Sequence, residues 1–232
     1  MPFTPASLRF LRGLAKNNNK PWFEAHRDEY EEALREPMRE LIGDMDARFS
    51  KFAPEIVGDP KRSMFRINRD IRFSEDRSPY KSHAACWFFH RRADHAVGSD
   101  AEGGSAGFYF HLEPGQSLVG AGLWMPPRPQ LNRLRDAIAD DPAKFANVAR
   151  SLTKRFGGLD DGDMLKRMPQ GFSETHPAAK WLKYKSFTTG RPMKDSQVVG
   201  SRLPSRLERE FMGLLPLVRW LNGALGFESP SR

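Results

Sequence analysis

The sequence predicts an α+β fold in a single domain, with a mainly antiparallel central sheet flanked by helices. Apolar residues recur at helical spacing near both ends of the chain, whereas alternating and aromatic-rich runs typical of strands gather between residues 63 and 126. Because the strand signals follow one another without helices between them, the pattern favours α+β over a doubly wound fold. We expect N-terminal helices over residues 4–52, a sheet-rich core over 63–126, and helices with short strands over 128–227.

Helix-start and helix-break signals define the N-terminal region. Thr4 and Pro5 suit the cap and the first turn of a helix, and three asparagines before Pro21 favour a turn after that helix. A second helical pattern runs from Trp22 to about residue 52. Because proline lacks a backbone N–H and clashes with the preceding helical turn, we expect a kink or a break at Pro37.

The central region contains a buried strand and a hairpin. Residues 84–90 (AACWFFH) are apolar enough for a buried strand, and GFYFHL is joined to SLVGAGLWM by residues 113–116, which contain a Pro-Gly turn. In the second hairpin strand, Gly120 and Gly122 leave one face without side chains, which permits close approach by a ligand or by another segment. Further helices are expected over about 129–140, 142–156 and 205–225.

The composition limits the classes of protein to which the chain can belong. The chain has 232 residues, a mean hydropathy of −0.62 and no apolar run long enough for a membrane span. The N-terminus lacks the apolar segment of a signal peptide, and the single cysteine, Cys86, excludes a disulfide framework. We therefore expect a soluble cytoplasmic protein without a membrane partner, in which Cys86 is a buried, unreactive thiol.

The net charge of +8 is distributed unevenly. Residues 1–20 carry four basic residues and no acidic residue. Residues 61–81 carry seven basic and three acidic residues, and residues 177–206 carry seven basic residues and one acidic residue. Residues 22–60 have the opposite balance, with five basic and eleven acidic residues. A uniformly basic coat for duplex DNA would not be expected to include such an acidic helix, whereas basic segments that converge on a pocket suit a small anion equally well.

An arginine-rich stretch over residues 63–83 is the leading candidate for a functional site. Apolar side chains at positions 65, 67, 71 and 73 share one parity, which predicts β structure with one face on the core. The other parity carries a polar row, and guanidinium groups suit phosphate or carboxylate. The candidate ligand-binding residues are Arg66, Arg69, Arg72, Tyr80 and Lys81, with Asp70 orienting an arginine or acting as a base.

The same stretch also permits a structural interpretation. Asp70, Glu75 and Asp76 can form ion pairs with neighbouring arginines. Three local acids cannot match seven basic residues, however, so the surplus favours either a bound anion or pairing with the acidic helix. The sequence leaves both interpretations open.

The hairpin offers a second candidate site. Tyr109, His111 and Glu113 alternate onto one surface, so an acid–base pair or a metal site is geometrically possible. We treat His111 and Glu113, together with Asp70, as candidate catalytic residues. Two ligands on one strand fall short of the three or four that a metal needs, so no metal or other cofactor is assigned; an ordinary polar sheet face is the alternative. Only tertiary contacts would add further histidines, among them His83, His90 and His176.

A third candidate segment covers residues 181–186, where aromatic residues alternate with Lys183 and Lys185. Such a segment can stack on bases while its lysines neutralise phosphates, or it can be an amphipathic element with snorkelling lysines. We include both lysines as candidate ligand-binding residues. The sequence contains no Walker A, GxGxxG or GxSxG motif, so it lacks the usual phosphate loops and the hydrolase elbow.

Several motifs together resemble a known family. They are LxxLxxNNxxxWFxxxRxxY at 11–30, FRxxRDxRFSxDxxPYK at 65–81, GFYFHLEPGxSxxGAGLWMP at 107–126 and HPAxxWLKxKSF at 176–187. In this order they resemble the bacterial and fungal family called domain of unknown function 2461, over nearly the whole chain. The resemblance implies a single domain, and it implies no particular activity, substrate or catalytic residue.

Two functional hypotheses follow. The first is a small-anion binder or an enzyme, in which the arginine-rich stretch lines a pocket that His111 and Lys183 complete. The second is a nucleic-acid-binding or protein-interaction module that uses the basic segments, with binding that weakens steeply as salt rises. We favour the first, because alternation with core residues would hold the arginines on rigid structure. A purely structural protein is a third possibility, and the sequence assigns no substrate or oligomeric state.

Overall fold

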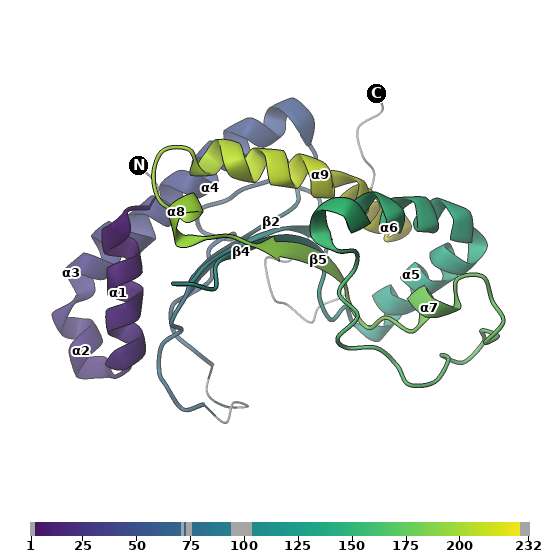
Figure 1. The fold of residues 1–232 in the computed structure, drawn as a ribbon, viewed down its shortest axis with the longest axis horizontal. Helices are drawn as coiled ribbons and strands as arrows, with labels where there is room; N and C mark the ends of the chain where they lie inside the picture. The colour runs from purple at the N-terminus through teal and green to yellow at the C-terminus, as the bar shows by residue number, and fades with distance from the viewer. Residues whose placement is uncertain (1–2, 71, 73–75, 94–103, 228–232) are drawn as a thin grey trace.

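The fold is built on a five-stranded antiparallel sheet whose strands follow one another in chain order (Figure 1). The computed structural model describes residues 3–70, 72, 76–93 and 104–227. The strands are β1 (Ile56–Val57), β2 (Ala84–His90), β3 (Gly107–Leu112), β4 (Leu118–Leu123) and β5 (Phe187–Pro192). Helices cover one face of this sheet and stand at both of its ends, so the predicted α+β class is confirmed.

Consecutive helical segments precede the sheet. They are α1 (Pro5–Lys16), α2 (Lys20–Ala25), α3 (Arg27–Tyr30), the π-helical segment η1 (Glu31–Arg35) and α4 (Glu36–Phe52). α1 begins where predicted, because the Thr4 hydroxyl accepts a hydrogen bond from the Ala6 N–H and Ser7 closes the reciprocal half of the cap. A kink or a break was predicted at Pro37, and the π-helical segment Glu31–Arg35 ends just before this residue. Because Pro37 cannot donate a hydrogen bond to the preceding turn, the regular α-helical pattern is interrupted in that turn.

The central hairpin is confirmed in its position and turn. β3 pairs with β4 from Gly107 opposite Gly122 to His111 opposite Leu118. Residues 113–117, which include the predicted turn at 113–116, connect the two strands. The close approach permitted by Gly122 is made by a strand: a Cβ at Gly122 would lie 1.9 Å from the carbonyl oxygen of Phe187 in β5. The backbone of Gly122 also has a φ of 132°, which side-chain-bearing residues rarely adopt.

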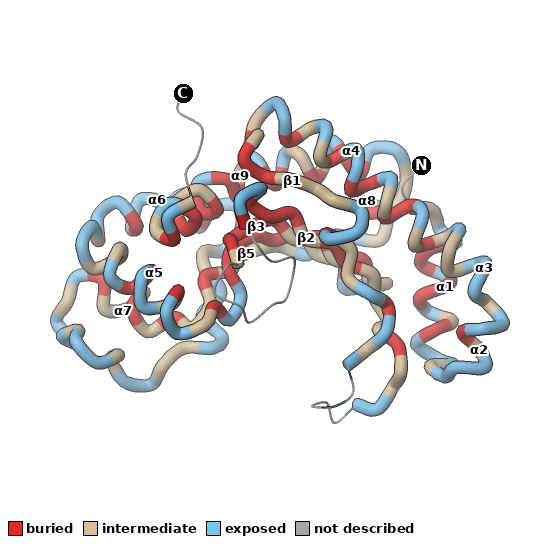
Figure 2. The backbone as a smooth tube through the Cα atoms, turned by 180° about the vertical axis from the view of Figure 1, so that it is seen from behind, coloured by how far each residue is buried: buried red, intermediate tan, exposed pale blue. Residues whose placement is uncertain are grey.

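One face of the sheet is covered by helices. Phe108 of β3 stacks on Phe49 of α4 and on Phe211 of α9 (Leu203–Ala224), with ring centroids 5.7 and 4.7 Å apart. Figure 2 shows buried residues running through the strands and the adjoining turns of α9. Cys86 lies on this covered face opposite Phe110, and complete burial raises the pKa of its thiol, so the predicted buried cysteine is confirmed. Side chains of the other parity lie on the open face.

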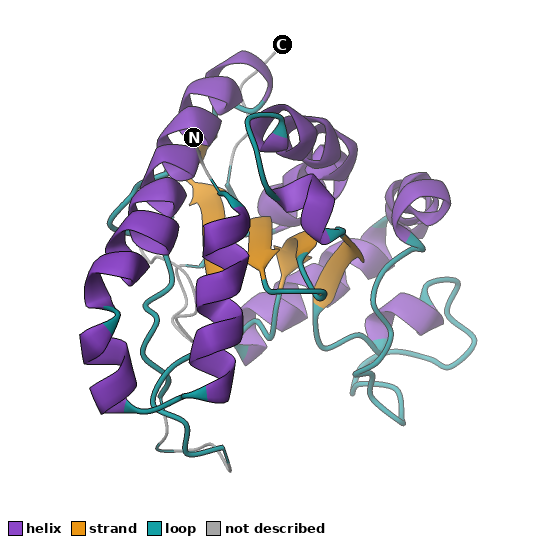
Figure 3. Cartoon of the chain, turned by 60° about the vertical axis from the view of Figure 1, so that its left-hand side comes forward, coloured by secondary structure: helices purple, strands orange, loops and turns teal. Residues whose placement is uncertain are grey.

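The remaining helices stand at the ends of the sheet. They are α5 (Arg128–Asp140), α6 (Pro142–Phe156), α7 (Ala179–Leu182) and the short α8 (Asp195–Val198). α5, α6 and α7 gather at one end and α1–α3 at the other (Figure 1), and Figure 3 looks onto the second end, where the N-terminal helices stand in front of the sheet. Among the described residues, no helix is both long enough and apolar enough to cross a bilayer.

The arginine-rich stretch is not the core strand that its alternation predicts. Residues 63–65 bond to the edge of β2, where the Phe65 N–H donates to Ala85 O and the Trp87 N–H donates to Ser63 O. The stretch then leaves the sheet and doubles back, so that residues 67–69 pair with 79–81. Positions 71 and 73 lie outside the described residues.

A buried carboxylate ties α9 to its neighbours. The Glu210 side chain is 1% exposed, and it pairs with Arg155 of α6 at 3.0 Å and with Arg191 of β5. A buried charge is tolerated only when it is paired and hydrogen-bonded. Through these ion pairs, Glu210 links helix α9 to helix α6 and to the edge strand β5.

Glu210→Ala should lower the free energy of unfolding by about 2–3 kcal/mol, below the roughly 3–5 kcal/mol typical of fully buried pairs. The reduction is expected because Arg155 and Arg191 are 35% and 40% exposed and regain hydration. Urea denaturation measures the change. Glu36→Ala, which removes the exposed partner of Arg39, is the matched control and should cost less than about 1 kcal/mol. Equal effects of the two substitutions would contradict the structural role of Glu210.

Candidate functional site

The open face of the sheet carries a cavity of about 880 Å³, which we call the sheet-face cavity. Its lining is mainly aromatic and aliphatic, and includes Phe65, Trp87, Tyr109, Leu118, Trp124 and Leu159. Gly120 and Gly190 are opposite one another in β4 and β5, so backbone forms part of the lining. The volume lies within the range of about 300–1,000 Å³ common for small-molecule sites.

A row of polar side chains begins beside this cavity. The hydroxyl of Tyr109 lies 3.0 Å from Nδ1 of His111, and Nε2 of His111 lies 2.9 Å from Oε2 of Glu113. The prediction that these three side chains share one surface is confirmed. The side chains of His111 and Glu113 are only 12% and 24% exposed, so their hydrogen bonds are largely shielded from water.

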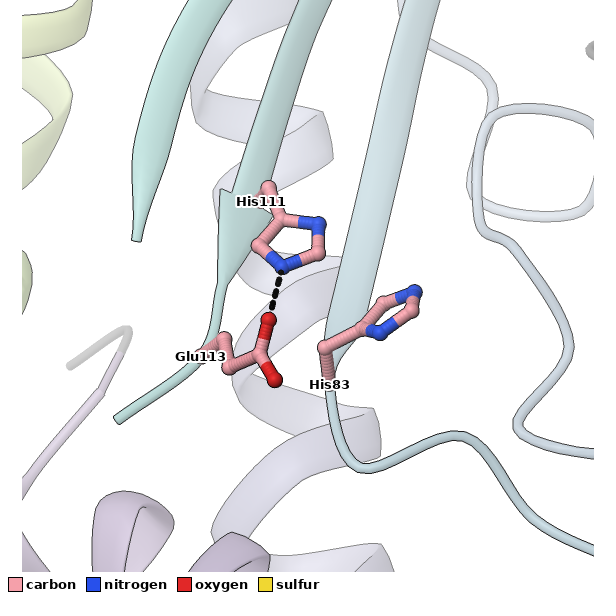
Figure 4. A group of neighbouring side chains, drawn as sticks. All are labelled: His83, His111 and Glu113. Atoms are coloured by element: carbon pink, nitrogen blue, oxygen red, sulfur yellow. Dashed lines mark hydrogen bonds and ion pairs between the residues drawn. The ribbon is translucent and has the colours of Figure 1, made fainter. Parts of the chain in front are cut away.

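His83 joins this row from the neighbouring strand. The register places Ala85 opposite His111, and because strand side chains alternate, His83 lies on the same face. The two imidazole centroids are 4.3 Å apart, and the nearest ligand atoms of His83, His111 and Glu113 all lie within 4.8 Å of one another (Figure 4). Burial, reinforced by His111, lowers the pKa of His83 to about 4 despite the opposing charge of Glu113, so the ring is neutral at neutral pH.

Three basic residues, Arg66, Arg69 and Lys81, gather beside His83, and we call them the cation cluster. The Lys81 Nζ lies 5.3 Å from the centroid of the Phe65 ring, and burial together with the charges of Arg66 and Arg69 lowers the pKa of Lys81. Arg69 pairs with Asp76 at 3.0 Å, yet its buried Nε has no hydrogen-bond partner among the described residues. Arg66 and Lys81 form no ion pair with any carboxylate in the described part of the chain.

Two other residues of the predicted pocket pair with one another. Asp70 pairs with Arg72 at 2.7 Å on the surface, where the Arg72 side chain is 75% exposed. Hydrogen bonds from Arg72 hold the pKa of Asp70 well below its usual range, so this pair matches the structural interpretation of the stretch. Tyr80 is buried and stacks on Phe23 of α2 at 4.1 Å, and together with Arg66 it lines a second cavity of about 780 Å³.

The two candidate lysines of the third segment are not near the cation cluster. Lys183 and Lys185 directly follow α7, at the end of the molecule opposite α1–α3 (Figure 1). Lys185 pairs there with Asp163 at 2.5 Å. The structure therefore brings His111 and Glu113 to the cation cluster, and it leaves both lysines outside this site.

Sequence reasoning missed the aromatic lining and did not assign His83. Odd-numbered positions along this segment hold Lys81, His83 and Trp87, and in a strand such alternate residues share a face. The signal becomes useful only once the pairing partner is known, because His83 meets His111 through the register of β2 against β3. Trp124 reaches the cavity at the end of β4 without any periodic signal.

The hydrogen bonds along the row assign a tautomer to His111. A carboxylate only accepts, so the Nε2 of a neutral His111 carries the proton donated to Glu113, and Nδ1 accepts from the Tyr109 hydroxyl. We predict the Nε2–H tautomer in ¹⁵N–¹H correlation spectra of the imidazole, recorded where the ring is neutral. Tyr109→Phe should shift the Nδ1 resonance and keep this tautomer. Observation of the Nδ1–H form in the wild type would contradict the assigned hydrogen bonds.

Comparison with known proteins identifies the family. The model of a family described as a conserved hypothetical protein (DUF2461) matches residues 6–220, which include every element of the site. No curated protein and no solved structure matched the chain. Because the match covers nearly the whole sequence, the chain belongs to the DUF2461 family.

Proposed function

We propose that the chain binds a small organic anion, with the anionic group at the cation cluster and the apolar body in the sheet-face cavity. The observation that carries this proposal is the surplus of positive charge at Arg66, Arg69 and Lys81. Among the carboxylates that the structure describes, only Asp76 forms an ion pair with the cluster, and it does so through Arg69.

An anion would supply the interactions that the cluster lacks. Like charges repel one another, and Lys81 is half-buried, so it has lost part of its hydration. A carboxylate or phosphate between the three cations would attract all of them. It would also offer an acceptor to the Nε of Arg69, for which the described part of the chain provides none. The two arginines favour such planar, bidentate anions over a simple halide.

Phe65 connects the cation cluster to the cavity. Its ring lies beneath Lys81, lines the sheet-face cavity and packs edge-on against Tyr109, with centroids 6.0 Å apart. A ligand held at Lys81 is therefore next to an aromatic lining. Trp124, which is 71% exposed, adds apolar surface to this lining, so an anion with an apolar or aromatic body fits better than an inorganic ion.

Strain at the cavity supports the same assignment. Met125 follows Trp124 in the lining and has a φ of 44°, a conformation that residues with side chains rarely adopt. The Met125 N–H donates to Ser186 Oγ at 2.8 Å, which helps to hold this geometry. Residues held in sparsely populated conformations gather at functional sites.

Nucleic-acid binding is the second candidate, and the distribution of charge favours it less. It requires an open and continuous positive face. The basic segment 177–206 begins near α7, at the end of the molecule opposite α1–α3 (Figure 1), and returns to α1, where Asp195 pairs with Arg12. Within this segment Lys180 and Lys185 pair with Asp161 and Asp163. These pairs reduce the positive field that a nucleic acid would meet.

The test is thermal unfolding in the presence of a panel of aromatic and aliphatic carboxylates and phosphates, with short DNA and RNA included. A ligand at 100 times its Kd should stabilise the wild type by about 2.7 kcal/mol. Arg69→Gln combined with Lys81→Gln should abolish the shift at the same ligand concentration, because each lost charged hydrogen bond costs roughly 1.5–3 kcal/mol.

Lys183→Gln combined with Lys185→Gln is the control, because it removes the same charge from outside the site. It should keep the full ligand-induced shift. Equal losses in the two double variants would show a general charge effect and contradict the proposed site. Stabilisation by nucleic acid alone, falling with salt by a slope of roughly −0.9 per phosphate contact, would favour the second candidate.

A further inference from the structure

We propose that His83, His111 and Glu113 bind a divalent transition-metal ion of the zinc class. These three side chains come from the end of β3 and the start of β2, and they converge on one point of the open sheet face (Figure 4). Metal binding here goes beyond the proposed anion binding and does not depend on it.

The geometry suits a small ion. The nearest ligand atoms of the three residues lie within 4.8 Å of one another. Tetrahedral zinc with bonds of roughly 2.0–2.2 Å separates its ligand atoms by about 3.3 Å, so modest side-chain rotations close the site. The ligands are half-buried; His111 lies in β3, and His83 and Glu113 directly adjoin the ends of β2 and β3. The site is therefore supported by rigid elements rather than by loops alone.

His83 provides the observation that a simple hydrogen-bonded row does not explain. Its ring is half-buried beside a second imidazole and two cations, yet neither ring nitrogen has a hydrogen-bond partner among the described residues. His111 and Glu113 bond to one another, and they have further partners in Tyr109 and Ser82. A metal ion bound by all three would give His83 a partner that the described residues do not supply.

The donor set selects the class of metal. Two imidazoles and one carboxylate suit zinc, cobalt, nickel or copper, whereas calcium and magnesium prefer oxygen ligands throughout. Three protein ligands also leave a coordination position open, which is typical of catalytic rather than structural zinc sites. Cys86 lies on the opposite face of the sheet and is not a ligand.

Tyr109 is positioned to orient one ligand. When Nε2 of a neutral His111 binds the metal, the single N–H proton of the ring lies on Nδ1 instead, and it is donated to the Tyr109 oxygen 3.0 Å away. Metal binding should therefore change His111 from the Nε2–H to the Nδ1–H tautomer. This change is measurable in the wild-type chain and does not require a variant to fold.

The test uses the full-length chain without a histidine tag, freed of metal by a chelator and titrated with Co²⁺ and then with Zn²⁺. We expect one Co²⁺ per chain, with the visible absorption of four- or five-coordinate cobalt, displaced by Zn²⁺. His83→Ala and Glu113→Gln should each lose this absorption. Tyr109→Phe should weaken binding by roughly 10–100-fold through the lost orientation of His111.

His176→Asn is the control, because asparagine can still accept the hydrogen bond that His176 Nδ1 receives from the Ala178 N–H. It should bind Co²⁺ as the wild type does. Wild-type binding that His83→Ala leaves unchanged would overturn the site, as would unshifted His83 and His111 resonances in excess Zn²⁺. Arg69→Gln with Lys81→Gln should keep the metal, so failure of anion binding and failure of metal binding are distinguishable.

Discussion

The register of β2 against β3 determines which side chains can act together. Ala85 lies opposite His111, so His83 and His111 share the open face with Tyr109 and Glu113. A shift of one residue would turn His83 toward the covered face and separate it from His111. The register is stabilised on the covered face, where aromatic side chains such as Phe108 pack between α4 and α9 and would otherwise become exposed.

Burial on one face of the sheet leaves the other face available for binding. Helices α4 and α9 complete the core on one side, and the open side combines an aromatic cavity, a hydrogen-bonded row and the cation cluster. These features meet at Phe65 and Tyr109, which belong to the cavity lining and contact one another. An apolar hollow with a few convergent polar groups is the usual form of a small-molecule site.

Local patterns were enough to predict the hairpin, the first helix and the shared surface of Tyr109, His111 and Glu113, because turn chemistry and strand alternation act over short distances. The core strand predicted from residue 65 onward does not form over residues 65–70, because pairing within the stretch replaced pairing with the sheet. The meeting of His83 with His111, and the separation of Lys183 from the cation cluster, depend on tertiary structure that periodicity does not encode.

The most direct measurement is titration calorimetry of a stabilising anion with the wild-type chain, with and without saturating Zn²⁺. If the cation cluster and the metal ligands form one site, each ligand should bind more tightly when the other is present, by the same factor in both orders of addition. Zn²⁺ adds positive charge and an open coordination position beside Lys81 and Arg69, so we predict tighter anion binding. An anion affinity that Zn²⁺ leaves unchanged would contradict a single shared site.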